Sequence, residues 1–254
     1  MREQRLVFGE VAREYDEVRA GYPAALVDAV FGYLGRVPER IVEVGAGTGK
    51  ATAAFAGRGA RITCLEPDPA MARVLRDRLP EAEVRVEGFE DFTPPAGGVP
   101  LVICAQAWHW VAAQVRLDKA RATLSPGGVL ALFGHEYSFV DDALEADLNR
   151  AYAAHAAELL DQGHGPPPPP GEHWLTRELA GHDGFTAVTA LAFESVVPYP
   201  TERYMALLAT FSPHRMLPEQ QRAVLYGGLA AAVDAHGGVV RTRLSTTLAM
   251  ARRT

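Results

Sequence analysis

The sequence predicts an α/β fold in which helices cover both faces of a mostly parallel sheet. Short runs at about residues 40–44, 100–105 and 129–133 are largely apolar, as expected of central strands that are buried on both faces. Segments with apolar residues at three- and four-residue steps separate these runs, which is the element order of an α/β domain. A long alternating segment, 239–250, has the pattern of an antiparallel edge strand.

The composition favours one domain with insertions. The chain has 254 residues and 48% of them are apolar, which is enough for a large core. The formal net charge is −6 and no run of lysines and arginines stands out, so a protein that binds by neutralising nucleic-acid phosphates is not expected. Cys64 and Cys104 both lie in apolar runs, and we expect them to be buried and reduced.

The sequence predicts neither a metal site nor a membrane segment. It has no C-x-x-C pair and no cluster of histidines, which are the usual signs of a zinc site. No apolar run approaches the length that spans a membrane, and residues 1–23 are too polar for a signal peptide. We therefore expect a soluble cytoplasmic protein.

A glycine-rich turn follows the first predicted strand. Gly45, Gly47 and Gly49 alternate with single residues, and a helix of small residues begins directly after them. Glycines in this place allow a sharp turn and the close approach of a ligand to the helix N-terminus. A dinucleotide fingerprint would need glycine in place of Lys50, and the carboxylate of Glu43 in the strand favours a cationic ligand over a pyrophosphate.

The pattern E-x-G-x-G-x-G over residues 43–49 resembles the first motif of class I S-adenosylmethionine-dependent methyltransferases. The resemblance implies a Rossmann-like sheet of seven strands, mostly parallel with an antiparallel last strand, with helices on both faces and helical lid inserts after strands five and six. It implies S-adenosylmethionine as cofactor and S-adenosylhomocysteine as its product. An ordinary strand-to-helix turn without a ligand is the alternative. The cofactor contacts implied in this turn are Glu43, Gly45, Ala46, Gly47, Thr48 and Gly49.

The second predicted strand, about 61–66, ends in another candidate for cofactor binding. Glu66 comes about twenty residues after the glycine turn, where a carboxylate typically accepts hydrogen bonds from ribose hydroxyls. This feature fits a dinucleotide as well as S-adenosylmethionine. The run from Glu66 to Met71 resembles the second motif of the family, in which Pro67 and Met71 pack on the adenine. A place in the helix core is the alternative for Met71.

An acidic turn follows the third predicted strand, about 83–87. After Gly88, the resemblance places the backbone N–H of Phe89 on the adenine ring and the carboxylate of Glu90 on the exocyclic amine. If the match to the family motif is shifted by one residue, Asp91 instead of Glu90 provides the carboxylate for the exocyclic amine. A solvated turn without a ligand is the alternative.

The loop after the fourth strand carries the candidate catalytic group. Ligands of open α/β sheets bind beyond the carboxyl ends of the strands, so Ala105, Gln106 and Ala107 are expected at the cofactor. His109 is suited to act as a general base, and Trp110 could form an apolar wall beside the methyl group. The A-x-x-x-H-W pattern resembles a subgroup often likened to trans-aconitate methyltransferases. A purely structural histidine is the alternative.

The segment before the first strand is predicted to be helical. Residues 1–23 hold a short amphipathic helix that begins near Phe8, followed by a second helix over 23–33. By the resemblance, residues 1–23 form an N-terminal cap from which Tyr15 and Arg19 close over the cofactor. A cap that only packs on the domain, with a solvated arginine, is the alternative.

The later part of the chain exceeds what the domain of this family needs. The turn L-S-P-G-G after a helix over 112–124 is highly typical of class I methyltransferases and leads into the fifth strand. We expect a single methyltransferase domain over residues 1–254, with a sixth strand at about 185–197 and substrate-covering inserts at 137–182 and 199–237. Candidate acceptor contacts, each of which can instead be structural, are Trp110, His135, Tyr137, Tyr204, His214 and Arg215.

The first insert also contains five consecutive prolines, 166–170, which predict a stiff loop that faces solvent.

The resemblance implies transfer of a methyl group from S-adenosylmethionine to a small molecule by in-line displacement, with a hydroxyl or carboxylate oxygen as the favoured acceptor. A hydroxyl needs a base, for which His109 is the candidate; a carboxylate needs none, and Arg19 or Arg215 would orient it. The alternatives are a non-catalytic S-adenosylmethionine-binding protein and an NAD(P)-dependent oxidoreductase. We expect no nucleic-acid or membrane partner, and a monomer or a homodimer.

Overall fold

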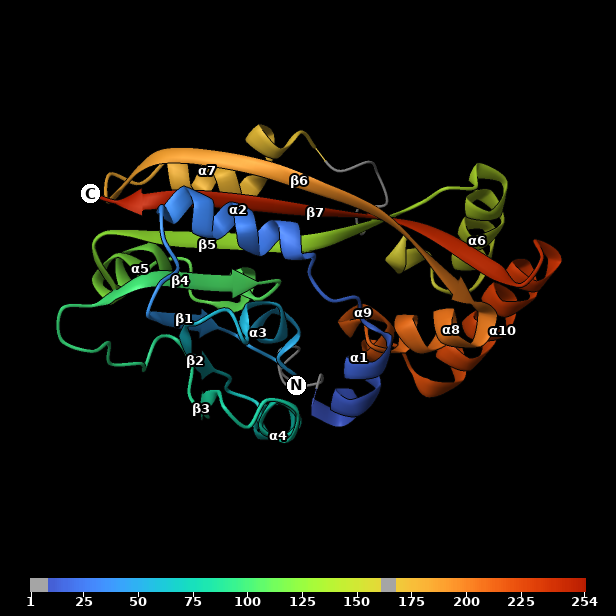
Figure 1. Ribbon diagram of the computed structural model, residues 1–254. Helices are drawn as coiled ribbons and strands as arrows, with labels where there is room; N and C mark the ends of the chain where they lie inside the picture. Colours follow the sequence, from blue (N-terminus) through green and yellow to red (C-terminus); the bar gives the residue numbers. More distant parts are fainter. Residues whose placement is uncertain (1–8, 161–167) are drawn as a thin grey trace. The chain divides into compact units, whose positions relative to one another are not determined.

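The computed structural model describes residues 9–160 and 168–254, and in this part of the chain seven strands form one sheet (Figure 1). The strands are β1 (Arg40–Val44), β2 (Arg61–Leu65), β3 (Glu83–Arg85), β4 (Val99–Ala105), β5 (Leu124–Phe139), β6 (Phe185–Pro200) and β7 (Val239–Arg253). They lie side by side in the order β3-β2-β1-β4-β5-β7-β6.

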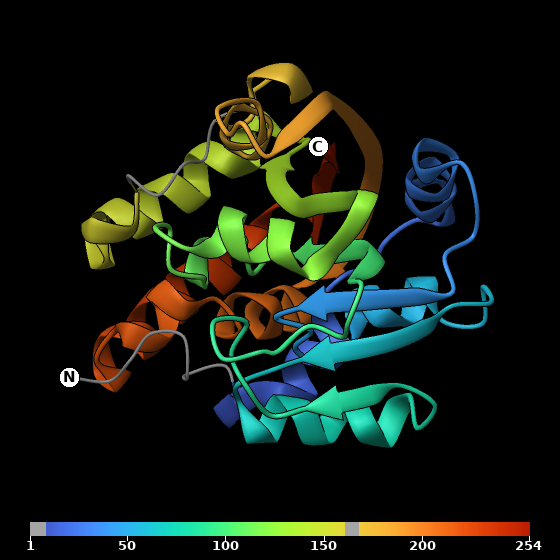
Figure 2. The same ribbon diagram turned by 90° about the vertical axis from the view of Figure 1, so that its left-hand side faces the viewer.

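The direction of the strands is that of a mostly parallel sheet. β1 pairs in parallel with β2 and β4, β2 pairs in parallel with β3, and β4 pairs in parallel with β5. Figure 2 shows the arrowheads of β1, β2 and β3 pointing the same way, whereas β7 runs against its neighbours in Figure 1. The predicted Rossmann-like fold with an antiparallel last strand is therefore confirmed.

Helices precede β1, connect the strands and follow β5 and β6, as predicted. The α-helices are α1 (Ala12–Val18), α2 (Ala24–Leu34), α3 (Lys50–Phe55), α4 (Pro69–Arg78), α5 (Arg116–Thr123), α6 (Asp142–His155), α7 (Trp174–Ala180), α8 (Thr201–Ala209), α9 (Ser212–Met216) and α10 (Glu219–Ala235). Short 3-10 turns are η2 (Gly9–Val11), η3 (Trp108–Trp110), η4 (Ala157–Leu159) and η5 (Pro170–Glu172). None of the helices in the described ranges is long and apolar enough to cross a membrane.

The last strands are longer than the sequence predicts. β5 covers sixteen residues instead of the expected 129–133, and β6 ends at Pro200 instead of 197. Most of β6 and the outer end of β5 are not buried, so an apolar pattern does not mark them. Phe8 and the first two prolines of the predicted proline loop lie outside the described residues.

The described residues group into two compact units. One, here called the sheet unit, consists of residues 20–135, 168–193 and 246–254. The other, here called the helical unit, includes the described residues 9–19, 136–160 and 194–245. The expected insert 137–182 is thus divided, because α7 belongs to the sheet unit.

The core of the sheet unit has two layers, one on each face of the sheet. Val42 of β1 packs in one apolar cluster with Leu179 of α7, whereas Ile41 packs in the other with Leu26 of α2 and Phe55 of α3. Consecutive residues of a strand point to opposite faces, so both faces of β1 are buried. This burial explains why the central strands are apolar throughout. Cys64 and Cys104 are buried and form no disulfide, as predicted.

The helical unit has a core of its own. Leu148 of α6, Leu207 of α8 and Leu229 of α10 are buried together in a third apolar cluster. α10 packs against both α6 and α8.

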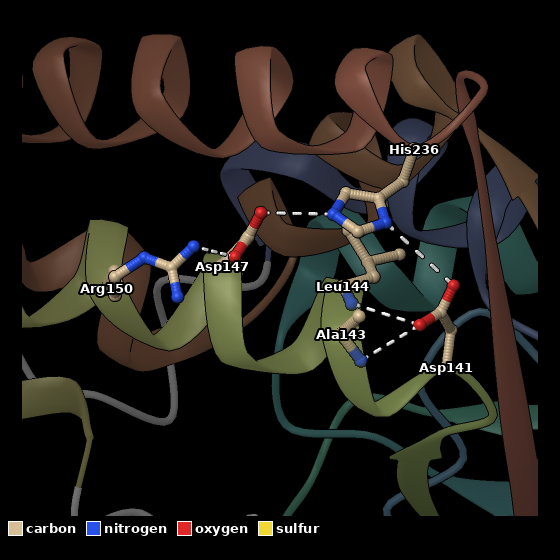
Figure 3. A network of polar contacts seen from close by, with 6 residues as sticks. All are labelled: Asp141, Ala143, Leu144, Asp147, Arg150 and His236. Atoms are coloured by element: carbon tan, nitrogen blue, oxygen red, sulfur yellow. Dashed lines mark hydrogen bonds and ion pairs between the residues drawn. The ribbon is translucent and has the colours of Figure 1, made fainter.

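A polar network ties the start of α6 to the end of α10 in this unit (Figure 3). Asp141 caps α6 by accepting hydrogen bonds from the N–H groups of Ala143 and Leu144, at 2.9 and 3.1 Å. His236, which follows α10, lies with Nε2 3.0 Å from Asp147 Oδ2 and Nδ1 3.9 Å from Asp141 Oδ2. The start of α6 and the end of α10 are therefore held together by these side chains.

Candidate functional site

The glycine turn after β1 adopts a backbone that side chains rarely allow. Gly45, Gly47 and Gly49 all have positive φ, of 65°, 57° and 85°. A Cβ on Gly45 would lie 2.4 Å from the Cβ of Ala107 in the loop after β4, so glycine is required there by space as well as by φ. A Cβ on Gly47 would meet nothing, so only φ requires that glycine.

Glu66 fastens this turn to the end of β2. Its Oε2 accepts a hydrogen bond of 2.7 Å from the N–H of Gly47, and its Oε1 accepts one of 2.8 Å from the N–H of Asp68. The carboxyl is buried, and burial raises its pKa to about 7. Each oxygen has a further lone pair with which to accept a hydroxyl, as the predicted ribose contact requires.

Glu43 lies fully buried inside β1. Its Oε2 accepts a hydrogen bond of 2.7 Å from the hydroxyl of Thr52 on α3. Burial raises the pKa of Glu43 to about 8, and the nearby Glu66 adds to this rise. A cationic group of a ligand near this carboxyl would oppose the shift and favour its ionised form.

The residues at the turn fit the cofactor that the sequence predicts. Two buried carboxyls, Glu43 and Glu66, suit the positive groups and the ribose of S-adenosylmethionine. Ala46 is small and buried, and the hydroxyl of Thr48 is buried with no hydrogen-bond partner among the described residues. A buried polar atom of this kind is unfavourable unless a ligand or water completes it.

The start of α4 holds the expected adenine-packing residues. Asp68 caps the helix by accepting from the N–H of Ala70 and of Met71, at 2.8 and 3.2 Å. Met71 is buried, whereas Pro67 is exposed. Their contact with adenine stays a prediction.

The acidic turn after β3 is fixed by contacts with the segment that precedes α5. Phe89 is buried, and the carboxylate of Glu90 accepts a hydrogen bond of 3.0 Å from the N–H of Ala112. Lys119 also donates to the carbonyl of Glu90. Asp91 is exposed. The choice between Glu90 and Asp91 as partner of the adenine amine, beside Gly88, therefore stays a prediction.

The end of β4 joins the site to β5 through one side chain. Gln106 has a positive φ of 62°, and its N–H donates to the carbonyl of Phe133 at 2.9 Å. Its side-chain amide donates to the carbonyl of His135 and accepts from the N–H of His135, at 2.9 and 2.7 Å. Gln106 thus continues the sheet pairing where the backbone leaves it. Ala105 and Ala107 flank it.

His109 lies at the exposed side of η3, and buried or partly buried side chains hold that turn in place. Trp108 is 2% exposed and its indole N–H donates to Glu178 Oε2 at 3.0 Å. Arg116 donates to Glu178 Oε1 at 2.6 Å and to the carbonyl of Trp108 at 3.0 Å. Partial burial and, after it, the charge of Arg116 lower the pKa of His109, which favours the neutral imidazole. Trp110 lies beside His109, with ring centroids 4.7 Å apart.

His135 is packed within the sheet unit. Its ring stacks on Tyr22 at 4.3 Å, and its Nδ1 lies 2.8 Å from the hydroxyl of Thr246. These contacts give His135 a packing role, and its contact with an acceptor stays a prediction.

Tyr15 and Arg19 belong to the helical unit. The guanidinium of Arg19 stacks on the ring of Phe211 at 3.9 Å, and its Nε donates to the hydroxyl of Thr210 at 2.8 Å. The ring of Tyr15 lies 5.1 Å from the same guanidinium. Arg215 lies on α9. The predicted cofactor contact of Tyr15 and Arg19 remains a prediction.

A cavity of about 200 Å³ lies within the helical unit. Three of the predicted acceptor contacts, Tyr137, Tyr204 and His214, line it together, although they come from β5, α8 and α9. Arg215 does not line it. Three of the candidates thus share one cavity, and their contact with an acceptor stays a prediction.

Sequence reasoning missed the residues that support these sites. Glu178 and Arg116 hold η3, and Tyr152 of α6 binds His214 in the cavity. No motif marks them, because each acts through a partner far away in the chain. The partly buried ion pair of Arg116 and Glu178 and the buried Tyr152 become visible only when the helices pack.

Comparison with known proteins places the motifs in one domain. The model of a methyltransferase domain matches residues 41–128, which include the glycine turn, Glu66 and His109. An uncharacterized methyltransferase of Mycobacterium tuberculosis is 34% identical over 131 residues, or 52% of this chain and 53% of that protein. The chain thus matches about half the length of this curated relative.

Two further matches extend over more of the chain. An uncharacterized methyltransferase of Schizosaccharomyces pombe is 26% identical over 218 residues, or 85% of this chain and 82% of that protein. The structure of a protein assigned as a type II methyltransferase, from Anaeromyxobacter dehalogenans, has a TM-score of 0.63 and 24% identity over 92% of this chain and 97% of its own. The latter likeness shows the fold. Together with the glycine turn and the order of the sheet, these matches show a methyltransferase domain over residues 41–128.

Proposed function

We propose that this protein transfers the methyl group of S-adenosylmethionine to an oxygen of a small-molecule acceptor, a hydroxyl or a carboxylate. The observation that carries the proposal is the bonding of Glu66, whose buried carboxylate holds the turn at Gly47 while keeping lone pairs for the ribose. This arrangement supports cofactor binding at the ends of β1 and β2, in the place where ligands of open α/β sheets bind.

S-adenosylmethionine supplies a methyl group already activated by its sulfonium. The carbon–sulfur bond breaks with its electron pair going to sulfur, and a carbon–oxygen bond forms to the acceptor. The protein then has to orient the reactants and exclude water. For a hydroxyl acceptor, the neutral form of His109, which its lowered pKa favours, takes the hydroxyl proton. A carboxylate acceptor releases no proton, and His109 would then serve only as a wall.

The remaining features of the proposal concern partners and location. The net charge of −6 supports a small molecule over a nucleic acid as substrate. We propose a cytoplasmic protein that acts as a monomer or a homodimer, and that needs no metal ion.

Calorimetric titration with S-adenosylhomocysteine, with NAD as the control, tests the cofactor assignment. We expect S-adenosylhomocysteine to bind at about micromolar Kd and NAD to give no heat, because Lys50 stands where the dinucleotide fingerprint needs glycine and the Glu43 carboxyl disfavours a pyrophosphate. Binding of NAD alone would contradict the proposal. Release of S-adenosylhomocysteine with a panel of hydroxyl and carboxylate acceptors then separates an enzyme from a protein that only binds the cofactor.

A further inference from the structure

The cavity of the helical unit has a lining of unusual chemistry. Among the described residues that line it, none is an aspartate, glutamate, lysine or arginine, and most are aromatic or aliphatic. Its polar groups are hydroxyls and one imidazole. Ligand pockets usually place a few polar groups in an apolar wall, and these groups report the polarity of the ligand.

Aromatic rings meet edge to face around the cavity. Tyr137 and Phe211 have centroids 5.9 Å apart at 84°, and Phe139 and Tyr204 have centroids 6.5 Å apart at 72°. Such pairs present both ring edges and ring faces, which is the environment that another aromatic ring prefers.

The tyrosine hydroxyls of the cavity stay neutral. Burial raises the pKa of Tyr137 to about 12 and raises the pKa of Tyr152 and Tyr204 further. The hydroxyl of Tyr152 lies 3.2 Å from Nε2 of His214, and both residues are buried. This pair offers hydrogen bonding of the kind that a hydroxyl can join.

Arg19, which interacts with the lining residue Tyr137, is already engaged by other groups. Arg19 does not line the cavity; it stacks on Phe211 and donates to both the hydroxyl and the carbonyl of Thr210. A carboxylate in the cavity would lose its water without gaining an ion pair from the lining, which is strongly unfavourable.

We propose that this cavity binds the methyl acceptor through an uncharged aromatic ring, and that the acceptor is a neutral aromatic hydroxyl compound of one or two rings rather than a carboxylic acid. The volume of about 200 Å³ lies below the range of drug-sized pockets, which sets the limit on ring number. That the bound compound is the methyl acceptor rests on the proposed methyl transfer. The binding preference of the cavity is a property of the helical unit alone.

The test compares neutral rings with their carboxylates. Phenol and 2-naphthol are titrated against benzoate and 2-naphthoate at pH 7.5, with the full chain saturated with S-adenosylhomocysteine. We expect at least one neutral ring to bind, and its carboxylate to bind at least about tenfold more weakly because its charge is desolvated. Failure of both neutral rings, or equal binding of the carboxylate, overturns the proposal.

A variant that fills the cavity locates the binding. Leu208 of α8 lines the cavity and is 5% exposed, so Leu208→Trp should weaken binding of the neutral ring at least about tenfold. Val224 of α10 is 50% exposed and does not line the cavity, so Val224→Trp is the matched control and should bind normally. Leu208→Phe replaces the first variant if its melting temperature shows loss of the fold. Normal binding by the filled variant overturns the proposal.

A titration with S-adenosylhomocysteine in the same preparations separates the two proposals. Binding of the rings without binding of S-adenosylhomocysteine contradicts the methyl transfer but keeps the cavity assignment. The opposite result contradicts only the cavity assignment.

Discussion

The two units of this protein hold polar groups of opposite character. The sheet unit buries two carboxyls, Glu43 and Glu66, within one turn and its strand, and these suit a ligand with positive charge and hydroxyls. The helical unit buries neutral tyrosines and a histidine around a cavity, and these suit an uncharged ring. The difference teaches that, if both proposals hold, the cofactor and the acceptor are recognised by separate chemistry and each can be altered without the other.

The largest effect is expected from the candidate base. His109→Gln should lower kcat for a hydroxyl acceptor about 10²-fold or more, because the proton then has no acceptor, while S-adenosylhomocysteine affinity stays the same. His155→Gln, at an exposed position of α6, is the control. An unchanged kcat would reduce His109 to a packing residue and leave carboxylate transfer as the reaction.

Removal of the Glu66 carboxyl tests the proposed cofactor site of the sheet unit. Glu66→Ala should weaken S-adenosylhomocysteine about 30- to 100-fold by calorimetry, because it removes charged hydrogen bonds and frees the N–H of Gly47. Glu83→Ala removes an exposed acid of β3 and should have no such effect. If Glu66→Ala kept full affinity, the assignment of the second motif would be wrong.

Loss of the contacts that hold η3 beneath His109 should have a smaller effect on kcat. Glu178→Gln can satisfy only one of the two donors, Trp108 and Arg116, so η3 should shift and kcat should fall about tenfold with unchanged cofactor affinity.

A pH profile distinguishes this positioning role from simple loss of stability. With Glu178 neutral, Arg116 should lower the pKa of His109 further, and the acidic limb of the kcat profile should move to lower pH. Glu172→Gln, an exposed acid nearby in sequence, is the control. A profile that does not move would contradict a link between Glu178 and His109.

The buried carboxyl of β1 predicts a dependence of stability on pH. Burial raises the pKa of Glu43 from 4.5 to about 8, so the folded state binds the proton more tightly than the unfolded state. Its contribution to the free energy of unfolding is therefore complete below about pH 4.5 and decreases as the pH rises to about 8, by at most about 1.4 kcal/mol per pH unit.

Glu43→Gln should remove that decrease. Denaturant unfolding at pH 5, 6, 7 and 8, without cofactor, should show a flatter profile for the variant than for the parent protein. Glu39→Gln, at a 61% exposed side chain, is the control and should follow the parent profile. Parallel profiles for Glu43→Gln and the parent would show that Glu43 is ionised in the folded state.

The smallest effect is expected in the helical unit. Asp141→Ala removes the cap of α6 and one contact of His236, and should lower the free energy of unfolding by about 1 kcal/mol. The adjacent Asp142→Ala makes the same change of charge without removing a cap. S-adenosylhomocysteine affinity should be equal in both variants, and a loss of affinity in Asp141→Ala alone would break the separation of the two units.

Much of the sheet unit could be predicted because its signals are local. The apolar run of β1, the three glycines and Glu66 lie within about 25 residues, and the ligand contacts there depend on backbone geometry that glycine spacing dictates. The ends of β5 and β6 could not be predicted, because exposed strand residues carry no apolar pattern. The membership of α7 in the sheet unit depends on the packing of Leu179 and on the hydrogen bond between Trp108 and Glu178. No local sequence pattern indicates either contact.

The sequence by itself determined the central strands of the sheet, the glycine turn and the acid after β2, since each follows from periodicity or spacing along one short segment. Only the tertiary structure decided which tyrosines and histidines share a cavity, and that Arg19 binds Thr210 while Glu178 supports η3. The physical reason is that residues such as Tyr137 and His214 are 77 positions apart in this sequence, and their meeting depends on the packing of whole helices rather than on any propensity of the residues themselves.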